Sequence, residues 1–237
     1  MNPYVNLTVE NGIGTIEFFH PKSNSLPGDL LKQLTKSITT AGEREDIRVI
    51  ILKSGGNRTF CAGASFDELI AIKDIDTGKA FFSGFANVIN AARKCSKFII
   101  GRVQGKVVGG GVGLASAADY CFATEYASVK LSELAIGIGP FVVGPSIERK
   151  IGLSAFSQLT INATGWQTAQ WAKEKGLFAE VYDSAEEMDA AIQILAEKLA
   201  SSNPKSMQGL KKILWEGTDH WDKLLKERAE ISGKRVL

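Results

Sequence analysis

The sequence predicts an α/β fold that ends in a helical region. Two runs of consecutive apolar residues, 49–52 and 98–100, lack polar alternation, which is typical of parallel strands buried on both faces. Between them, the segment 76–95 repeats apolar residues at helical spacing. Because helices alternate with buried strands, we expect parallel pairing through right-handed crossovers. After residue 145 the pattern is almost wholly helical.

The N-terminal half supplies most of the predicted sheet. Residues 5–9 and 13–19 alternate apolar and polar side chains on either side of a turn that contains Gly12, which predicts a hairpin. Pro27 suits the first position of a helix, and apolar residues recur at helical spacing after it. Further short strands are expected at 120–123 and 128–131.

The C-terminal half supplies most of the predicted helices, together with one strand at 177–181. The helices are expected at 154–162, 168–175, 185–200, 204–216 and 220–231. We find no low-complexity linker and no internal repeat. This organisation favours one α/β core with an appended helical region.

The composition argues against several classes of protein. The 237 residues include 28 basic and 26 acidic side chains, so the chain lacks the basic excess typical of nucleic-acid binders. The apolar runs are shorter than the roughly 18 residues of a membrane span, and no secretory signal is recognisable. Three cysteines without a CxxC pair and two histidines indicate a reducing compartment and no zinc site. We therefore expect a cytoplasmic protein without metal, nucleic-acid or membrane partners.

A glycine-rich segment carries the clearest chemical signal. Gly109, Gly110 and Gly111 precede small residues that suit a tightly packed helix. Glycine lets a ligand approach the backbone, and a helix N-terminus presents unpaired N–H groups with a partial positive charge. The segment fits neither the dinucleotide fingerprint nor the P-loop. It suits an anion or a developing oxyanion, and a tight turn with close helix packing explains it equally well.

Three blocks of sequence occur in a fixed order. The first is 60–64, rich in small residues; the second is 105–119, which holds the glycines; the third is 129–140, in which Glu133 precedes a turn with Gly139. Each block is moderately specific, and their order and spacing make the combination strong. Together they resemble the crotonase (enoyl-CoA hydratase/isomerase) superfamily, over nearly the whole chain.

The resemblance implies a fold, an assembly and a ligand. A crotonase-like ββα superhelix core would occupy 1–190, and a C-terminal helical trimerisation region would occupy 191–237. That region is shorter than the resemblance leads us to expect, so either the family's final helix is missing or the chain is truncated. The implied assembly is a homotrimer or a dimer of trimers. The implied ligand is an acyl-CoA substrate, with no separate cofactor because coenzyme A is part of the substrate.

The same resemblance implies roles for individual residues. The N–H groups of Ala64 and Gly110 would form an oxyanion hole for the thioester oxygen, each donor contributing about 2.7–4 kcal/mol in the transition state. Glu133 would be the catalytic acid/base, and its apolar neighbours predict a raised pKa if the side chain is buried. An exposed loop carboxylate is the alternative for Glu133. The implied substrate-binding residues are Ala62, Ala64, Ser65, Phe66, Asp67 and Gly110.

One position departs from the hydratases of this family. They carry a second glutamate three residues after the middle glycine, where this chain has Gly113. The loop after Glu133 also lacks the extra acid of the dienoyl isomerases. This pattern, with a single glutamate, is most similar to that of the Δ3,Δ2-enoyl-CoA isomerases, in which one base moves a proton along the acyl chain. Two alternatives stay open: a hydratase with a second acid or water from elsewhere, such as Asp67 or Glu68, and an inactive acyl-CoA-binding paralogue.

For two further groups of residues, the sequence allows two interpretations. Phe81, Phe82 and Phe85 are expected in the core, with the wall of an acyl tunnel as the alternative. Lys211 and Lys212 are expected either to meet the phosphates of coenzyme A or to lie on a solvated helix face.

Overall fold

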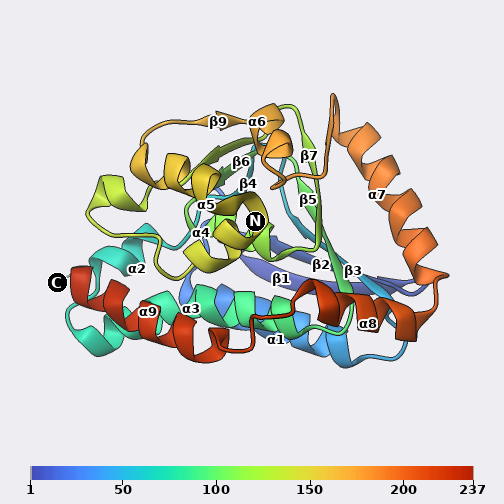
Figure 1. Cartoon of the computed structure of the whole chain (residues 1–237), viewed down its shortest axis with the longest axis horizontal. Coiled ribbons are helices and arrows are strands. Elements are labelled where there is room, and N and C mark those ends of the chain that lie inside the picture. Colours follow the sequence, from blue (N-terminus) through green and yellow to red (C-terminus); the bar gives the residue numbers. More distant parts are fainter. Residues whose placement is uncertain (1, 237) are drawn as a thin grey trace.

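The computed structural model describes residues 2–236 and contains two sheets with helices packed around them (Figure 1). The strands are β1 (Tyr4–Glu10), β2 (Ile13–Phe19), β3 (Val49–Ser54), β4 (Thr59–Cys61), β5 (Phe98–Val103), β6 (Lys106–Val108), β7 (Tyr120–Thr124), β8 (Ser128–Lys130), β9 (Gln167–Thr168) and β10 (Glu180–Tyr182). The helices are α1 (Gly28–Glu43), α2 (Phe66–Ile70), α3 (Ile75–Lys94), α4 (Gly110–Ala117), the 3₁₀ helix η1 (Glu133–Ile136), α5 (Gly144–Ile161), α6 (Ala169–Glu174), α7 (Ala185–Ala200), α8 (Pro204–Leu214) and α9 (Trp221–Val236).

The larger sheet has the strand order β1-β2-β3-β5-β7-β10. The first pair is an antiparallel hairpin, and Asn11 and Gly12 in its turn both have positive φ, as such turns require. The remaining pairs are parallel. The predicted α/β fold class, hairpin and parallel pairing are therefore confirmed.

The larger sheet is covered on both faces. Along β3, Ile50 and Leu52 point into the main core, which includes residues of α1 and α3. Val49 and Ile51 point the other way, into a second core that Met188 and its neighbours on α7 complete. This alternation explains why the run 49–52 is continuously apolar, because each successive side chain finds a buried surface.

The smaller sheet has the order β4-β6-β8-β9, and its first three strands are parallel. Its strands are two or three residues long, too short for a periodic pattern, and only β8 was predicted. Each parallel strand leads into a residue of interest: β4 into Ala64, β6 into Gly110 and β8 into Glu133. Since the strands are parallel, these segments leave the sheet at the same edge.

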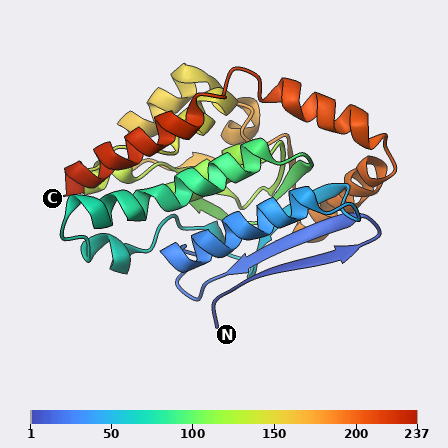
Figure 2. The ribbon, with the colours of Figure 1, turned by 90° about the horizontal axis from the view of Figure 1, so that it is seen from below.

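The C-terminal region folds back along the rest of the chain. The expected boundary after residue 190 falls inside α7, whose buried side chains pack on the larger sheet. After α8, helix α9 returns and runs alongside α3 (Figure 1, Figure 2). Among residues 2–236, no helix is long and apolar enough to cross a membrane.

A buried ion pair fastens α8 to the larger sheet. Nζ of Lys211 lies 2.6 Å from Oδ2 of Asp119, and the two side chains are 3% and 7% exposed. Asp119 also accepts hydrogen bonds from the Ile99 amide and the Trp215 indole. Lys211 is thus not on a solvated face, and its charge is already paired, whereas Lys212 is exposed.

Candidate active site

A mostly apolar cavity of about 230 Å³ lies where the parallel strands of the smaller sheet end. Its lining brings together five residues that the sequence singled out in three separate parts of the chain: Ala62, Ala64, Phe66, Gly110 and Glu133. Two larger hollows, of about 480 and 500 Å³, have several basic side chains in their walls; the second is lined by Lys211 and Lys212, and neither contains a residue selected for catalysis. The cavity of about 230 Å³ is therefore the candidate active site.

The loop after β4 holds the Ala64 amide beside the start of α4. Backbone hydrogen bonds from Leu26 N to Gly63 O (2.8 Å) and from Ser65 N to Leu26 O (3.3 Å) fix the peptides on both sides of Ala64. Gly63 has φ +86°, and a methyl group placed on it would lie 3.2 Å from the amide nitrogen of Gly110. The two chain segments are therefore in close contact at the cavity wall.

Gly110 is the first residue of α4, so its N–H has no partner within that helix. Across residues 2–236, neither the Ala64 nor the Gly110 amide donates a hydrogen bond. Close packing also requires glycine here: a methyl group on Gly110 would lie 2.4 Å from the Phe85 ring. The tight-packing interpretation of the glycines is thus confirmed, and it coexists with unpaired amides that line a cavity.

Glu133 begins η1 and turns its carboxylate into the cavity. Oε1 lies 3.1 Å from where a methyl group on Gly109 would sit, so that glycine leaves room for the carboxylate. Oε2 is buried and has no hydrogen-bond partner in the described part of the chain. Burial removes water from the ionised form and raises the pKa of Glu133 from 4.5 to about 7, with a small opposing effect of its own backbone N–H. The exposed-carboxylate alternative is excluded.

The space that a second carboxylate needs is filled. A methyl group on Gly113 would lie 2.5 Å from Cγ1 and 2.7 Å from Cβ of Val143, so no side chain fits there without a shift. The neighbouring Val142 lines the cavity. Glu68 is engaged elsewhere, since its Oε2 accepts a hydrogen bond from the Gly28 amide. Within the cavity lining, Glu133 is the acidic residue.

The phenylalanines of α3 form one wall of the cavity. Phe81, Phe82 and Phe85 all line it, and the first two meet edge to face with ring centroids 5.0 Å apart. The interpretation as a cavity wall is supported, and Phe85 also belongs to the core. Sequence reasoning missed Ile138 and Val142, which also line the cavity, because nothing in their pattern distinguishes them from ordinary core residues.

Two of the implied substrate-binding residues lie outside the lining. The Ser65 hydroxyl accepts a hydrogen bond from the Glu68 amide and caps α2. Asp67 forms an exposed ion pair with Lys22. Phe66, 60% exposed, is at the rim of the cavity. Contact of Ser65 and Asp67 with coenzyme A therefore stays a prediction.

The other reactive groups near the site have structural roles. Cys61 is buried, and desolvation raises the pKa of its thiol to about 12, so it stays protonated at neutral pH. Residues 2–236 contain no group of three His, Cys, Asp or Glu side chains placed to hold a metal ion. The chemistry that the site itself offers is two amide donors and one carboxylate with a pKa near neutrality. Such a set suits proton transfer next to a carbonyl group.

Comparison with known proteins gives consistent matches. The family model "Enoyl-CoA hydratase/isomerase" matches residues 8–231. The peroxisomal Delta(3,5)-Delta(2,4)-dienoyl-CoA isomerase of Arabidopsis thaliana is 29% identical over 206 residues, 81% of this chain and 72% of the relative. The mitochondrial methylglutaconyl-CoA hydratase of Mus musculus is 30% identical over 200 residues, 83% of this chain but only 63% of the longer relative.

The fold is also shared with solved structures. The crystal structure of enoyl-CoA hydratase from Bacillus halodurans superimposes with a TM-score of 0.90 at 20% identity, covering 98% of this chain and 95% of that chain. At that identity the likeness concerns the fold alone. The similar sequences carry the names of both isomerases and hydratases.

Proposed function

Because the chain belongs to the enoyl-CoA hydratase/isomerase family, we propose that it moves the double bond of an enoyl-CoA from Δ3 to Δ2. The observation that carries this proposal is the single buried carboxylate, Glu133, in a cavity that two unpaired amides also line. One carboxylate is sufficient to shuttle a proton between two carbons of an acyl chain. Addition of water across the double bond is better served by two.

The proposed reaction uses the backbone and one side chain. Ionised Glu133 removes a proton from C2 of the 3-enoyl thioester, and the electron pair delocalises onto the thioester oxygen. The amides of Ala64 and Gly110 donate hydrogen bonds to that oxyanion. Protonated Glu133 then returns the proton to C4, the double bond forms between C2 and C3, and the carboxylate is regenerated. The residues needed for these steps all line the cavity.

A hydratase is the second candidate, since the mouse relative carries that name. It would need an ordered water molecule, because Val143 occupies the space at Gly113. An acyl-CoA-binding paralogue without activity is the third. Incubation with 3-hexenoyl-CoA and, separately, with crotonyl-CoA distinguishes the three. We expect 2-hexenoyl-CoA from the first substrate and little hydration of the second. Hydration without isomerisation would support the hydratase, and no turnover of either substrate would support the paralogue.

The pKa of Glu133 sets the expected pH dependence of the reaction. The base must be ionised, so kcat/KM should fall about tenfold per pH unit below the pKa of about 7 and level off above it. A pH–rate profile with 3-hexenoyl-CoA at constant ionic strength measures this. A profile that stays level from about pH 5 to about pH 8 would contradict a base with this raised pKa.

The packing at Gly113 is open to a separate test of stability. We expect Gly113→Ala to lower the free energy of unfolding by about 1–3 kcal/mol, because its methyl group overlaps Val143. Urea unfolding measures the loss. The matched control repeats Gly113→Ala in a Val143→Gly variant, where the overlap is absent. If Gly113→Ala lowers the free energy of unfolding equally in that variant, the overlap with Val143 is not the cause.

The assembly remains a proposal that rests on the family resemblance. We propose a homotrimer or a dimer of trimers. Three large apolar side chains on the outer face of α8, Leu210, Ile213 and Leu214, are 53%, 65% and 51% exposed and offer a surface for such contacts.

A further inference from the structure

Helix α9 is seated directly on α3, the helix that carries the phenylalanine wall. At the crossing, a methyl group on Gly78 would lie 2.8 Å from Cα of Gly233, and one on Gly233 would lie 2.8 Å from the Lys79 nitrogen. Only glycine at both positions lets the two backbones approach so closely. An ion pair of 3.3 Å between Lys79 and Glu230 lies close to the crossing. The contacts of Gly233 and Glu230 thus fix the position of α9 on α3.

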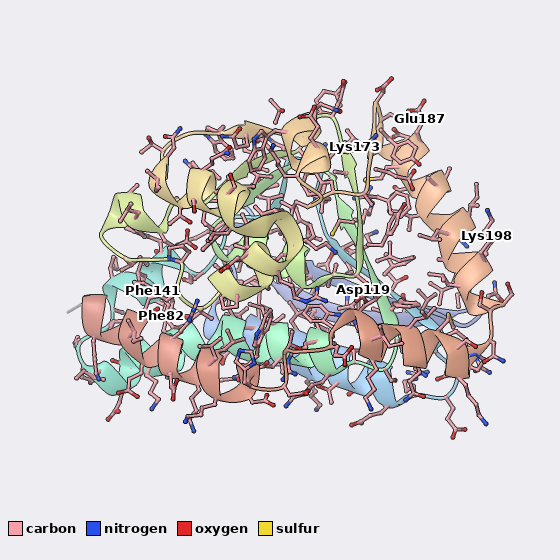
Figure 3. The ribbon with its side chains drawn as sticks, in the orientation of Figure 1. Phe82, Asp119, Phe141, Lys173, Glu187 and Lys198 are labelled. Atoms are coloured by element: carbon pink, nitrogen blue, oxygen red, sulfur yellow. The ribbon has the colours of Figure 1, made fainter. Side chains whose placement is uncertain are left out.

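From this position, α9 reaches the loop 139–143, whose Val142 lines the cavity. Nη1 of Arg228 donates a hydrogen bond to the carbonyl oxygen of Phe141 (3.2 Å). Within residues 2–236, Arg228 forms no ion pair, so the loop is the partner of its charge. Figure 3 places Phe141 and Phe82 at the same end of the molecule, near the C-terminal half of α9.

The loop 139–143 contributes two apolar side chains at and beside the cavity. Val142 lines the cavity, and Val143 fills the space at Gly113. Both valines immediately follow the carbonyl group that Arg228 holds. If this carbonyl group were released, the loop could move away from α4, and water would gain access to the acyl chain beside Glu133.

We propose that Arg228 is a positioning residue, which holds the loop 139–143 against the active site and so excludes water from the reacting acyl group. This inference rests on the proposed isomerase function. When water enters, the 2-enoyl product is hydrated: Glu133 takes a proton from water, the hydroxide oxygen bonds to C3, and the glutamate returns the proton to C2. The position of Arg228 on α9 therefore determines which product leaves the enzyme.

The test is the ratio of hydrated to isomerised product from 3-hexenoyl-CoA. Arg228→Met keeps the aliphatic stem and removes the donors. We expect it to lower the rate of isomerisation about tenfold, the effect of losing one charged hydrogen bond, and to raise the ratio of 3-hydroxyhexanoyl-CoA to 2-hexenoyl-CoA by a similar factor. Arg228→Lys, which keeps a donor, should restore most of the wild-type ratio. Arg149→Met is the control, because Arg149 stacks on Trp215 and, in the described part of the chain, forms no hydrogen bond with the loop.

The ratio separates positioning from general damage. A partly unfolded variant makes less of both products and leaves the ratio unchanged. A wild-type ratio in Arg228→Met overturns the inference while leaving the isomerase proposal intact, and so does an equal rise in Arg149→Met. If Arg228→Met fails to fold, Arg228→Lys and Arg228→Gln decide: the ratio must rise more for glutamine than for lysine. If the wild-type protein does not isomerise 3-hexenoyl-CoA, the proposed function itself fails, and this inference fails with it.

Discussion

Glu133→Gln is expected to lower kcat for the isomerisation of 3-hexenoyl-CoA by about 10³-fold. The substitution keeps the size of the side chain and removes its ability to accept and return a proton. Because Glu133 is the acidic residue in the cavity lining, we expect no neighbouring carboxylate to replace it. Binding of a saturated acyl-CoA should change little, since the apolar walls and both amides remain.

The same substitution should stabilise the fold at about pH 8. The carboxyl group has a pKa of about 7 in the folded chain against 4.5 ordinarily. Between these values the folded state binds more protons than the unfolded state, so the free energy of unfolding falls as pH rises, and it stays reduced above about pH 7. The neutral amide does not carry this penalty, so we expect a gain of about 1–3 kcal/mol for Glu133→Gln at about pH 8 and little gain at about pH 4.

Kinetics with 3-hexenoyl-CoA and urea unfolding at the two pH values measure these effects. Glu187→Gln is the matched control, because Glu187 is exposed on α7, far along the chain from the cavity residues (Figure 3). It should change neither quantity appreciably. Turnover of Glu133→Gln at the wild-type rate would remove Glu133 from the mechanism, and equal stability at both pH values would contradict the burial of its charged form.

Glu133→Gln is expected to lower activity but to raise stability, which indicates why a glutamate occupies this position. A buried Oε2 without a hydrogen-bond partner weakens the fold. Glutamine or leucine at this position would avoid that cost, so packing does not explain the glutamate. Proton transfer does, because the same burial that destabilises the carboxylate brings its pKa close to neutral pH, where it can both accept and donate a proton.

Much of the fold was predictable because its elements are long enough to show a period. The turn at Gly12, the two-sided burial of 49–52 and the helix beside the phenylalanines all follow from local patterns, and the structure confirms them. The selected residues Ala64, Gly110 and Glu133 were found because each lies in a block that resembles a known family. The structure then placed them around one cavity.

The remaining features depend on contacts between segments distant in sequence. Strands β4, β6 and β9 have two or three residues and exist only through their neighbours. Nothing near Gly113 in the sequence indicates that Val143 occupies the space where a side chain at position 113 would lie. Lys211 looks like a surface residue of α8 until Asp119, 92 positions away, is placed beside it. Local periodicity cannot report such pairings.

That ion pair is the basis of the largest expected effect on stability. We expect Asp119→Ala to lower the free energy of unfolding by about 3–5 kcal/mol, because it leaves Lys211 buried without a counterion. The substitution also removes the acceptor for the Ile99 amide (2.7 Å) and the Trp215 indole (2.8 Å), so two further buried donors lose their partner. Figure 3 shows Asp119 between the larger sheet and α8, so the loss should loosen the attachment of that helix.

Urea unfolding measures the effect, and two variants show whether charge burial is its cause. Asp46→Asn removes the acid from an exposed ion pair, in which the side chains of Asp46 and Arg44 are 58% and 41% exposed. It should lower the free energy of unfolding by less than about 1 kcal/mol. Asp119→Leu combined with Lys211→Met removes both buried charges and should be more stable than Asp119→Ala, because no charge is left unpaired. A loss for Asp119→Ala no larger than that of the exposed pair would show that Lys211 finds water or another acceptor when Asp119 is absent. The attachment of α8 would then depend on its apolar contacts alone.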